Sequence, residues 1–206
     1  TLIALFLDWR LALFALTVQY LAASFLFTDL LDPRLAIIKL FVGMFVGLIL
    51  YMTARQVDYG RLPEDLTPEE IIHLKEEKRV TLGRWRLSRG LAVRLMAISL
   101  TIVLLLIITQ LSLVRLPGTP QDLPYINAAI LILMSLGLVG LLTNRDPIPA
   151  GMGFFTFLTG FELYYAGLNQ SVSMLAAFAA LNLVAALAVA FLAQVRRASL
   201  YLLNDD

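Results

Sequence analysis

The sequence predicts an all-α integral membrane protein with six transmembrane helices, both termini on the cytoplasmic side, and one cytoplasmic helical loop. Three observations lead to this prediction: 60% of the 206 residues are hydrophobic, only 15% are charged, and the hydrophobic residues form long runs. Soluble domains contain about 45–50% apolar and about 25% charged residues. The composition therefore excludes a disordered chain and argues against a water-soluble globule.

Two further counts narrow the function classes. The chain has no cysteine, which removes disulfides, thiolate metal sites and iron–sulfur clusters. It has 16 Lys and Arg against 15 Asp and Glu, so its charge gives no signal for nucleic acid.

Six stretches are long and apolar enough to cross a bilayer, which takes about 20 residues because a rise of about 1.5 Å per residue must cover about 30 Å of hydrocarbon. Lipid offers the backbone no hydrogen bonds, so each stretch is expected to be helical. They are residues 11–27, 35–53, 91–114, 125–142, 148–168 and 172–193. Residues 1–7 show no signal-peptide pattern and are interpreted as an interfacial lead-in; because the sequence starts with Thr1 rather than Met, we expect some sequence to precede it.

Turn and cap residues separate the stretches. Asp32 and Pro33 precede the second, and three prolines lie between the third and the fourth. Asp146 is expected to cap the fifth helix, with Pro147 at its first position. A short uncharged connection, residues 167–171, joins the fifth helix to the sixth.

The distribution of Lys and Arg predicts the orientation. With six helices, one side of the membrane holds 12 of these residues and the other side holds two, Arg34 and Arg115. The 12 are Arg10, Arg55, Arg61, Lys75, Lys78, Arg79, Arg84, Arg86, Arg89, Arg145, Arg196 and Arg197. We therefore expect a multi-pass protein of the cell (inner) membrane with helices in residues 1–53 and 91–197, and with a cytoplasmic loop, residues 54–90, and tail, residues 198–206.

The cytoplasmic loop carries its own signals. Thr67, Pro68 and Glu70 form a capping box that starts a helix expected to run to about Val80. Residues 67–80 are either a docking surface for a cytoplasmic partner or a solvated linker. The following residues are expected to anchor the loop at the lipid headgroups: Arg84, Trp85, Arg86 and Arg89. The single histidine lies in this loop, so no metal site is expected.

Glu162 is the most conspicuous polar residue inside the predicted spans, because a charge at mid-bilayer costs at least about 2.5–3.5 kcal/mol. Thr159 and Tyr165, three residues to either side, share its helix face and are potential hydrogen-bond partners. Glu162 is interpreted either as a protonatable relay group or as a neutral acid that hydrogen-bonds a neighbouring helix.

Other intramembrane residues leave two interpretations each. Asn182 and Gln19 either join helices or hold water. Lys39 either extends to the interface or pairs with an acid such as Glu162, and Arg94 is expected to extend to the interface. Small residues predict close helix packing along the fifth and second helices, at Gly153, Gly160, Gly167, Gly43 and Gly47.

No enzyme motif or cofactor signature is present in the sequence. The last three helices, about residues 125–197, share a pattern that consists of the turn Asn144-Arg145 and the intramembrane pair Gly160 and Glu162, with Asn169 a looser match. In this pattern they resemble the small membrane subunit of complex I, of membrane-bound hydrogenases and of multisubunit cation/proton antiporters. The family's second carboxylate, on the last helix, is absent; Asn182 is the nearest polar residue.

The resemblance implies a non-catalytic subunit of a proton- or cation-translocating energy-coupling complex, with Glu162 as a protonatable group and Lys39, Asn182, Tyr165 and Thr159 as further relay candidates. Its partners would be other membrane subunits and lipid, with no nucleic acid and no cofactor. The alternative is a structural or assembly subunit of a respiratory or photosynthetic complex. A stand-alone transporter is disfavoured, since no internal repeat is detectable.

Overall fold

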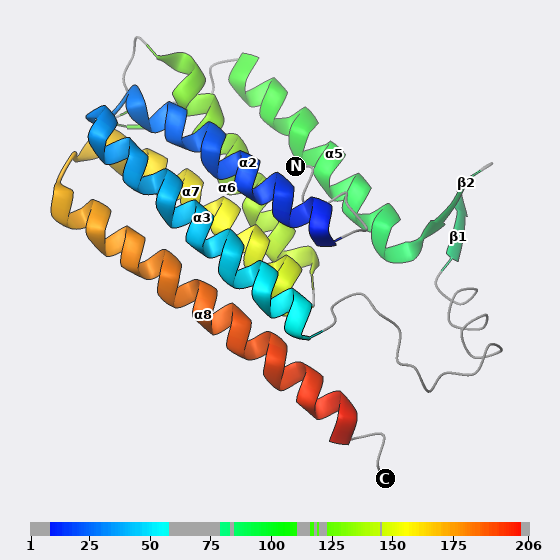
Figure 1. The fold of residues 1–206 in the computed structure, drawn as a ribbon. Coiled ribbons are helices and arrows are strands. Elements are labelled where there is room, and N and C mark those ends of the chain that lie inside the picture. Colours follow the sequence, from blue (N-terminus) through cyan, green and yellow to red (C-terminus); the bar gives the residue numbers. More distant parts are fainter. Residues whose placement is uncertain are drawn as a thin grey trace.

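The computed structural model describes residues 9–57, 79–82, 85–110, 116, 117, 119, 123–144 and 146–202. These residues form six long helices and one hairpin (Figure 1). The helices are α2 (Trp9–Thr28), α3 (Pro33–Gln56), α5 (Arg89–Gln110), α6 (Pro124–Thr143), α7 (Pro147–Leu168) and α8 (Val172–Leu202). Each helix coincides with one of the six predicted stretches, and α8 continues beyond the predicted end to Leu202.

Within the described residues, α2, α3, α6 and the Val172–Arg196 part of α8 are each long and apolar enough to cross a membrane. The described side chains of α5 include a shorter apolar segment, Met96–Leu105. Helix α7 packs against α2, α6 and α8. A helix shielded by three others can carry polar side chains that lipid would not tolerate.

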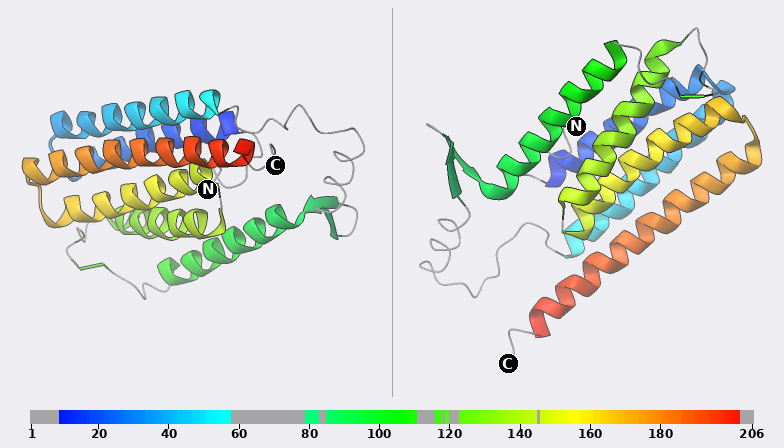
Figure 2. Two further views of the ribbon diagram at one scale, coloured as in Figure 1. Left: turned by 90° about the horizontal axis from the view of Figure 1, so that it is seen from below. Right: turned by 180° about the vertical axis from the view of Figure 1, so that it is seen from behind.

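Helices that follow one another in the sequence run in opposite directions, so the bundle has two ends (Figures 1 and 2). At the first end, called here the Gln56 end, Gln194 of α8 donates to Gln56 of α3 at 3.2 Å. At the opposite end, the Leu30 end, Gln170 donates to the carbonyl of Leu30 at 2.6 Å. The start of α2 and the end of α8 both lie at the Gln56 end, while α5 lies beside α6 at the edge of the bundle.

Aspartates occupy the N-cap positions of α3 and α7, and only the second was predicted as a cap. Asp32 accepts a hydrogen bond from the backbone N–H of Arg34 at 3.0 Å, with Pro33 at the first position of α3. Asp146 occupies the N-cap position of α7, but its side chain makes no capping bond. It pairs instead with Arg196 of α8 at 2.9 Å, because the end of α8 reaches this loop and offers a full positive charge.

The polar loop at residues 54–90 differs from the prediction at its C-terminal part. Strands β1 (Arg79–Leu82) and β2 (Trp85–Ser88) pair antiparallel, with Arg79 opposite Ser88. The expected helix therefore does not reach Val80. The β-branched side chains of Val80 and Thr81 favour a strand once a partner strand is available. The remainder of that predicted helix, Arg84 and the lead-in at residues 1–7 lie outside the described residues.

Two apolar clusters form the described core. One, towards the Gln56 end, includes Leu16, Val46 and Phe155. The other, towards the Leu30 end, includes Phe27, Ala36 and Leu163. Several polar side chains are buried in the bundle as well, among them Lys39 of α3 and Glu162 of α7.

Candidate functional site

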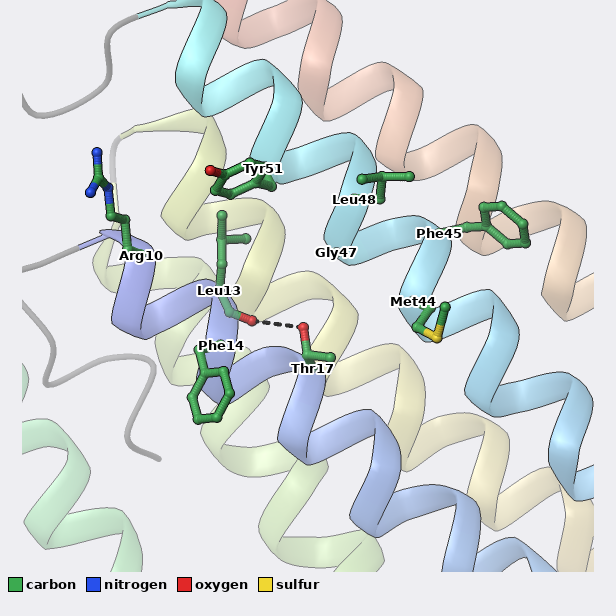
Figure 3. Close-up of a pocket in the computed structure, with 9 residues that line it drawn as sticks. All are labelled: Arg10, Leu13, Phe14, Thr17, Met44, Phe45, Gly47, Leu48 and Tyr51. Carbon is green, nitrogen blue, oxygen red and sulfur yellow. Dashed lines mark hydrogen bonds between the residues drawn. The ribbon is translucent and has the colours of Figure 1, made fainter.

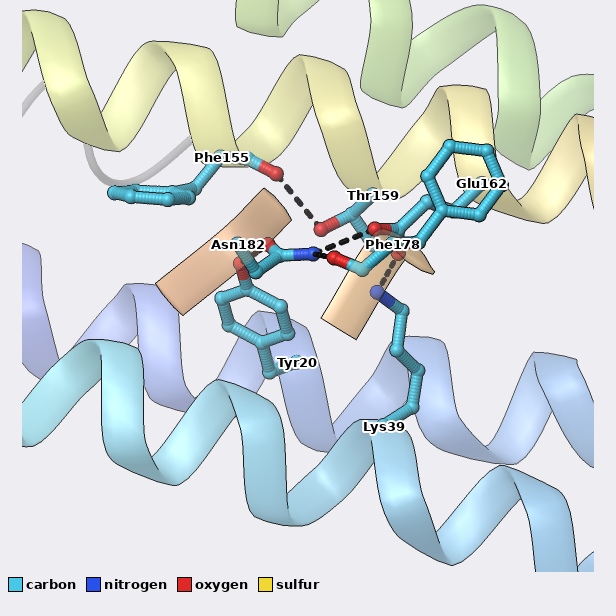
Figure 4. A network of polar contacts seen from close by, with 7 residues as sticks. All are labelled: Tyr20, Lys39, Phe155, Thr159, Glu162, Phe178 and Asn182. Atoms are coloured by element: carbon cyan, nitrogen blue, oxygen red, sulfur yellow. Dashed lines mark hydrogen bonds and ion pairs between the residues drawn. The ribbon is translucent and has the colours of Figure 1, made fainter. Parts of the chain in front are cut away.

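A buried ion pair joins α3 to α7. The ammonium of Lys39 contacts carboxylate oxygen Oε2 of Glu162, and the two side chains are only 3% and 2% exposed (Figure 4). The Lys39 nitrogen also lies 5.9 Å from the centre of the Phe27 ring, within the range of a cation–π contact. Each charge thus has a partner in an environment where an isolated charge would be very unfavourable.

Asn182 of α8 connects this pair to α2. Its amide nitrogen Nδ2 donates to Glu162 Oε1 at 2.5 Å and to the carbonyl of Phe178 at 2.8 Å. Its amide oxygen accepts from the Tyr20 hydroxyl at 3.0 Å. Asn182 is fully buried, so hydrogen bonds to both ends of its amide compensate for the loss of water.

Thr159 lies beside this network and Tyr165 lies outside it. The Thr159 hydroxyl donates to the carbonyl of Phe155 at 2.7 Å and is also in hydrogen-bonding reach of Tyr20. The half-buried Tyr165 ring packs edge-on against Phe178, with ring centres 5.4 Å apart. The structure thus brings together Lys39, Glu162, Asn182 and Thr159, and adds Tyr20. We call these five residues the polar network.

The polar network lies well inside the bundle. Lys39 is six residues after the first residue of α3, Pro33, and Glu162 is six residues before the last residue of α7, Leu168. At 1.5 Å per residue, both lie about 9 Å from the Leu30 end. Lys39 is buried at this depth and turns towards Glu162, so it does not extend to the interface.

A second polar contact joins α2 to α7 one turn nearer the Gln56 end. The hydroxyl of Thr156 donates to the side-chain oxygen of Gln19 at 3.2 Å and to the carbonyl of Met152 at 2.9 Å. The amide nitrogen of Gln19 is buried and has no hydrogen-bond partner among the described residues. Gln19 therefore joins two helices, one of the two roles expected for it.

Glycines on α7 allow α6 to approach its backbone. A Cβ atom added to Gly153 would lie 2.4 Å from the backbone nitrogen of Leu141, and one added to Gly160 would lie 2.9 Å from that of Met134. The third glycine of the predicted stripe, Gly167, is half-buried near the end of α7.

Glycines on α3 likewise allow α2 to approach the backbone of α3. A Cβ on Gly43 would meet the Tyr20 ring at 2.4 Å, and one on Gly47 would meet the Thr17 hydroxyl at 3.1 Å. Gly43 thus leaves the space that the Tyr20 ring occupies, and Tyr20 is the residue that reaches Asn182.

Tyr20 is the network residue that the sequence analysis missed. Its signal was present: a tyrosine near the middle of a span, away from the interfaces where tyrosine usually lies. The predicted interface anchor is described only as backbone, with Trp85 and Arg86 in β2 and Arg89 at the start of α5. No group of three or more potential metal ligands occurs among the described residues.

The fold and the site together define a class, a helical membrane protein with a buried polar network shared by four helices. No protein-family model matches the chain, and neither a curated protein nor a solved structure matches it.

Proposed function

We propose that the chain is a non-catalytic membrane subunit of a proton-translocating energy-coupling complex, in which Glu162 and Lys39 carry the proton. The observation that carries this proposal is the buried Lys39–Glu162 ion pair within the polar network. The proposal also draws on the sequence resemblance of residues 125–197 to the small membrane subunit of complex I and its relatives, which includes Glu162 itself.

The pair suits proton transfer in a medium of low dielectric constant. Moving a proton from the ammonium to the carboxylate converts an ion pair into a neutral acid and a neutral amine, so the net charge stays the same. A bundle interior tolerates such a shift far better than the arrival of an uncompensated charge. Asn182 holds Glu162 by a hydrogen bond while the proton moves, and the Tyr20 hydroxyl holds Asn182 in turn.

The groups around Glu162 favour a proton over Na⁺. One carboxylate oxygen faces the Lys39 ammonium and the other faces the amide N–H of Asn182. Both neighbours are donors, whereas a hard metal cation needs several oxygen ligands around it. The amide oxygen of Asn182 is turned away and accepts from Tyr20.

The proposed setting is the cell inner membrane, with six spans that include α5 and α7 and with both termini in the cytoplasm. Three of the basic residues predicted for the cytoplasm, Arg10, Arg55 and Arg196, lie at the Gln56 end. Large apolar side chains of α8 are exposed, including Val184, which is 63% exposed. They offer surface to lipid and to other membrane subunits, while residues 67–80 are the proposed contact for a cytoplasmic partner.

The test is proton transport by the assembled complex that carries Glu162→Gln. We expect transport to fall at least tenfold with the complex present at its normal level, because the amide cannot take up the proton. Asp29→Asn is the matched control, since Asp29 is an exposed acid whose contact is with Tyr125 at the Leu30 end. Undiminished transport by a normally assembled Glu162→Gln complex would refute the relay role.

The second candidate function is a structural or assembly subunit without an ion-relay role. The observation in its favour is that the polar network joins α2, α3, α7 and α8, as a structural clamp would. The double variant Lys39→Met/Glu162→Gln separates the two functions, because it removes both charges together. Normal assembly with normal transport indicates the structural role, whereas normal assembly without transport indicates the relay. Deleting residues 67–80 tests the structural role further, since loss of assembly there with Glu162 dispensable supports it.

A further inference from the structure

A groove on the outer surface of the bundle lies apart from the polar network. It runs between α2 and α3, has a volume of about 470 Å³, and opens along one side (Figure 3). Its walls are apolar side chains, among them Phe14 of α2 and Phe45 and Leu48 of α3. These three are 68%, 54% and 53% exposed, so the described part of the chain leaves them uncovered.

The floor of the groove is apolar as well. Gly47 presents no side chain there, and the Thr17 hydroxyl is engaged with the carbonyl of Leu13 at 3.0 Å. Both helices are long and apolar enough to cross a membrane, so the groove opens towards hydrocarbon. A flexible apolar chain lying in it would meet no unsatisfied polar group.

One end of the groove differs in chemistry from the rest. Arg10 and Tyr51 line it at the Gln56 end, where the Tyr51 ring lies 5.8 Å from the Trp9 ring and the Arg10 guanidinium lies 5.4 Å from that indole. Tryptophan and tyrosine are enriched at the headgroup level of membranes. Arg55 follows Tyr51 by four residues, so this exposed arginine lies on the same face of α3, one turn nearer the helix end.

The dimensions agree with a single lipid tail. Arg10 and Thr17 are seven residues apart on α2, a distance of about 10 Å along the axis. One leaflet offers about 15 Å of hydrocarbon, half of the bilayer core. The groove thus extends from the headgroup level through most of one leaflet.

We propose that this groove binds a phospholipid with a net negative headgroup, with an acyl chain between α2 and α3 and the phosphate at Arg10 and Arg55. Arg10 lines one end of the apolar groove, and Arg55 lies one turn beyond Tyr51 on the same helix. A phosphate with an attached hydrocarbon tail complements both the basic end and the apolar walls. The site depends on neither Glu162 nor ion transport, so it stands or falls independently of the proposed function.

Tryptophan quenching by brominated lipid tests the proposal on the full chain. The chain has two tryptophans, so Trp85→Phe leaves Trp9, at the groove end, as the reporter. This variant is reconstituted in mixed vesicles in which either phosphatidylglycerol or phosphatidylcholine carries bromine on its chains. We expect Trp9 to be quenched more strongly by brominated phosphatidylglycerol than by equimolar brominated phosphatidylcholine.

Variants that remove single charges test whether Arg10 and Arg55 cause the preference for phosphatidylglycerol over phosphatidylcholine. Each arginine near a phosphate contributes about a fivefold preference, so Arg55→Gln is expected to reduce the preference about fivefold and Arg10→Gln/Arg55→Gln about 30-fold. Arg34→Gln is the matched control, since this exposed arginine lies at the Leu30 end. If the double variant fails to fold, Arg55→Gln alone decides, because it changes only an exposed side chain in the last turn of α3.

Three results would overturn the proposal. Equal quenching by the two lipids means that the groove holds bulk lipid without selection. An equal loss of preference in Arg34→Gln means that net charge, and not the groove, attracts the lipid. Quenching by neither lipid means that a protein segment, from a second copy or another subunit, covers the groove.

Discussion

Replacing Glu162 with glutamine removes the negative charge that Lys39 contacts and leaves most of the bundle unchanged. The amide has nearly the same shape, and its oxygen can still accept from Asn182. The main physical consequence is an ammonium group, only 3% exposed, without a counter-charge. The variant therefore measures how much the protein depends on charge compensation at this position.

The expected cost follows from the burial of both side chains. Removing one member of a buried ion pair typically destabilises a protein by about 3–5 kcal/mol. This destabilisation cannot exceed about 5 kcal/mol, because deprotonating a lysine at pH 7 costs about that much and removes the unpaired charge. We therefore expect Glu162→Gln to lower the free energy of unfolding by about 3–4 kcal/mol, and Lys39→Met to lower it by about 3 kcal/mol.

The double variant tests this prediction, because it separates the loss of charge compensation from the loss of each side chain. Lys39→Met/Glu162→Gln contains no buried charge, so we expect it to lose only about 1 kcal/mol and to be more stable than either single variant. The measurement is reversible unfolding in mixed micelles, followed by tryptophan fluorescence, for all four members of the cycle. Asp29→Asn serves as a control and is expected to change stability by no more than about 1 kcal/mol, since its acid is exposed.

The reasoning is refuted if the two single effects add. Independent sites add within about 0.5 kcal/mol, so an additive double variant would be destabilised by about 6–7 kcal/mol. That result would mean that Lys39 and Glu162 do not compensate each other in the membrane-embedded protein, and the proposed proton exchange between them would lose its basis.

Three further predictions follow from the packing and the topology. Gly153→Ala places a methyl group 2.4 Å from a backbone nitrogen of α6 and is expected to cost at least about 2–3 kcal/mol in the same unfolding assay, whereas Gly47→Ala meets only a hydroxyl at 3.1 Å and should cost less than about 1 kcal/mol. Asn182→Leu leaves the Tyr20 hydroxyl and one oxygen of Glu162 without their partner, and we expect a loss of about 2–3 kcal/mol; a loss below 0.5 kcal/mol would mean that these hydrogen bonds contribute little. Because the chain has no cysteine, single cysteines at Gln170 and Arg196 can be labelled in oriented vesicles; the positive-inside distribution predicts that only the second is reached from the cytoplasmic side, and the reverse pattern contradicts the proposed orientation.

The helical segments could be predicted because each depends on a local property. A run of about 20 apolar residues forms a helix in lipid whatever its neighbours are. The same reasoning found Glu162, since one carboxylate stands out in an apolar run. It failed at Val80, because strand β1 depends on pairing with Trp85–Ser88, a contact between segments.

Which residues belong to the polar network depends on how each helix is rotated about its own axis, and not only on how deep each residue lies along its helix. Sequence position gives the depth of Lys39, Glu162, Asn182 and Tyr20 along their helices, but not the direction in which each helix turns its side chains. Those directions follow from the packing of neighbouring helices, such as the contact between Gly43 and the Tyr20 ring.

By itself, the sequence determined a chain of membrane-spanning composition, the approximate positions of its helices and one acid that needs a partner. Only the tertiary structure decided that the partner is Lys39 and that Asn182 and Tyr20 complete the network. The physical reason is that the hydrophobic effect and backbone hydrogen bonding act along a single helix, whereas charge pairing and hydrogen bonds between side chains require four helices to be in place together.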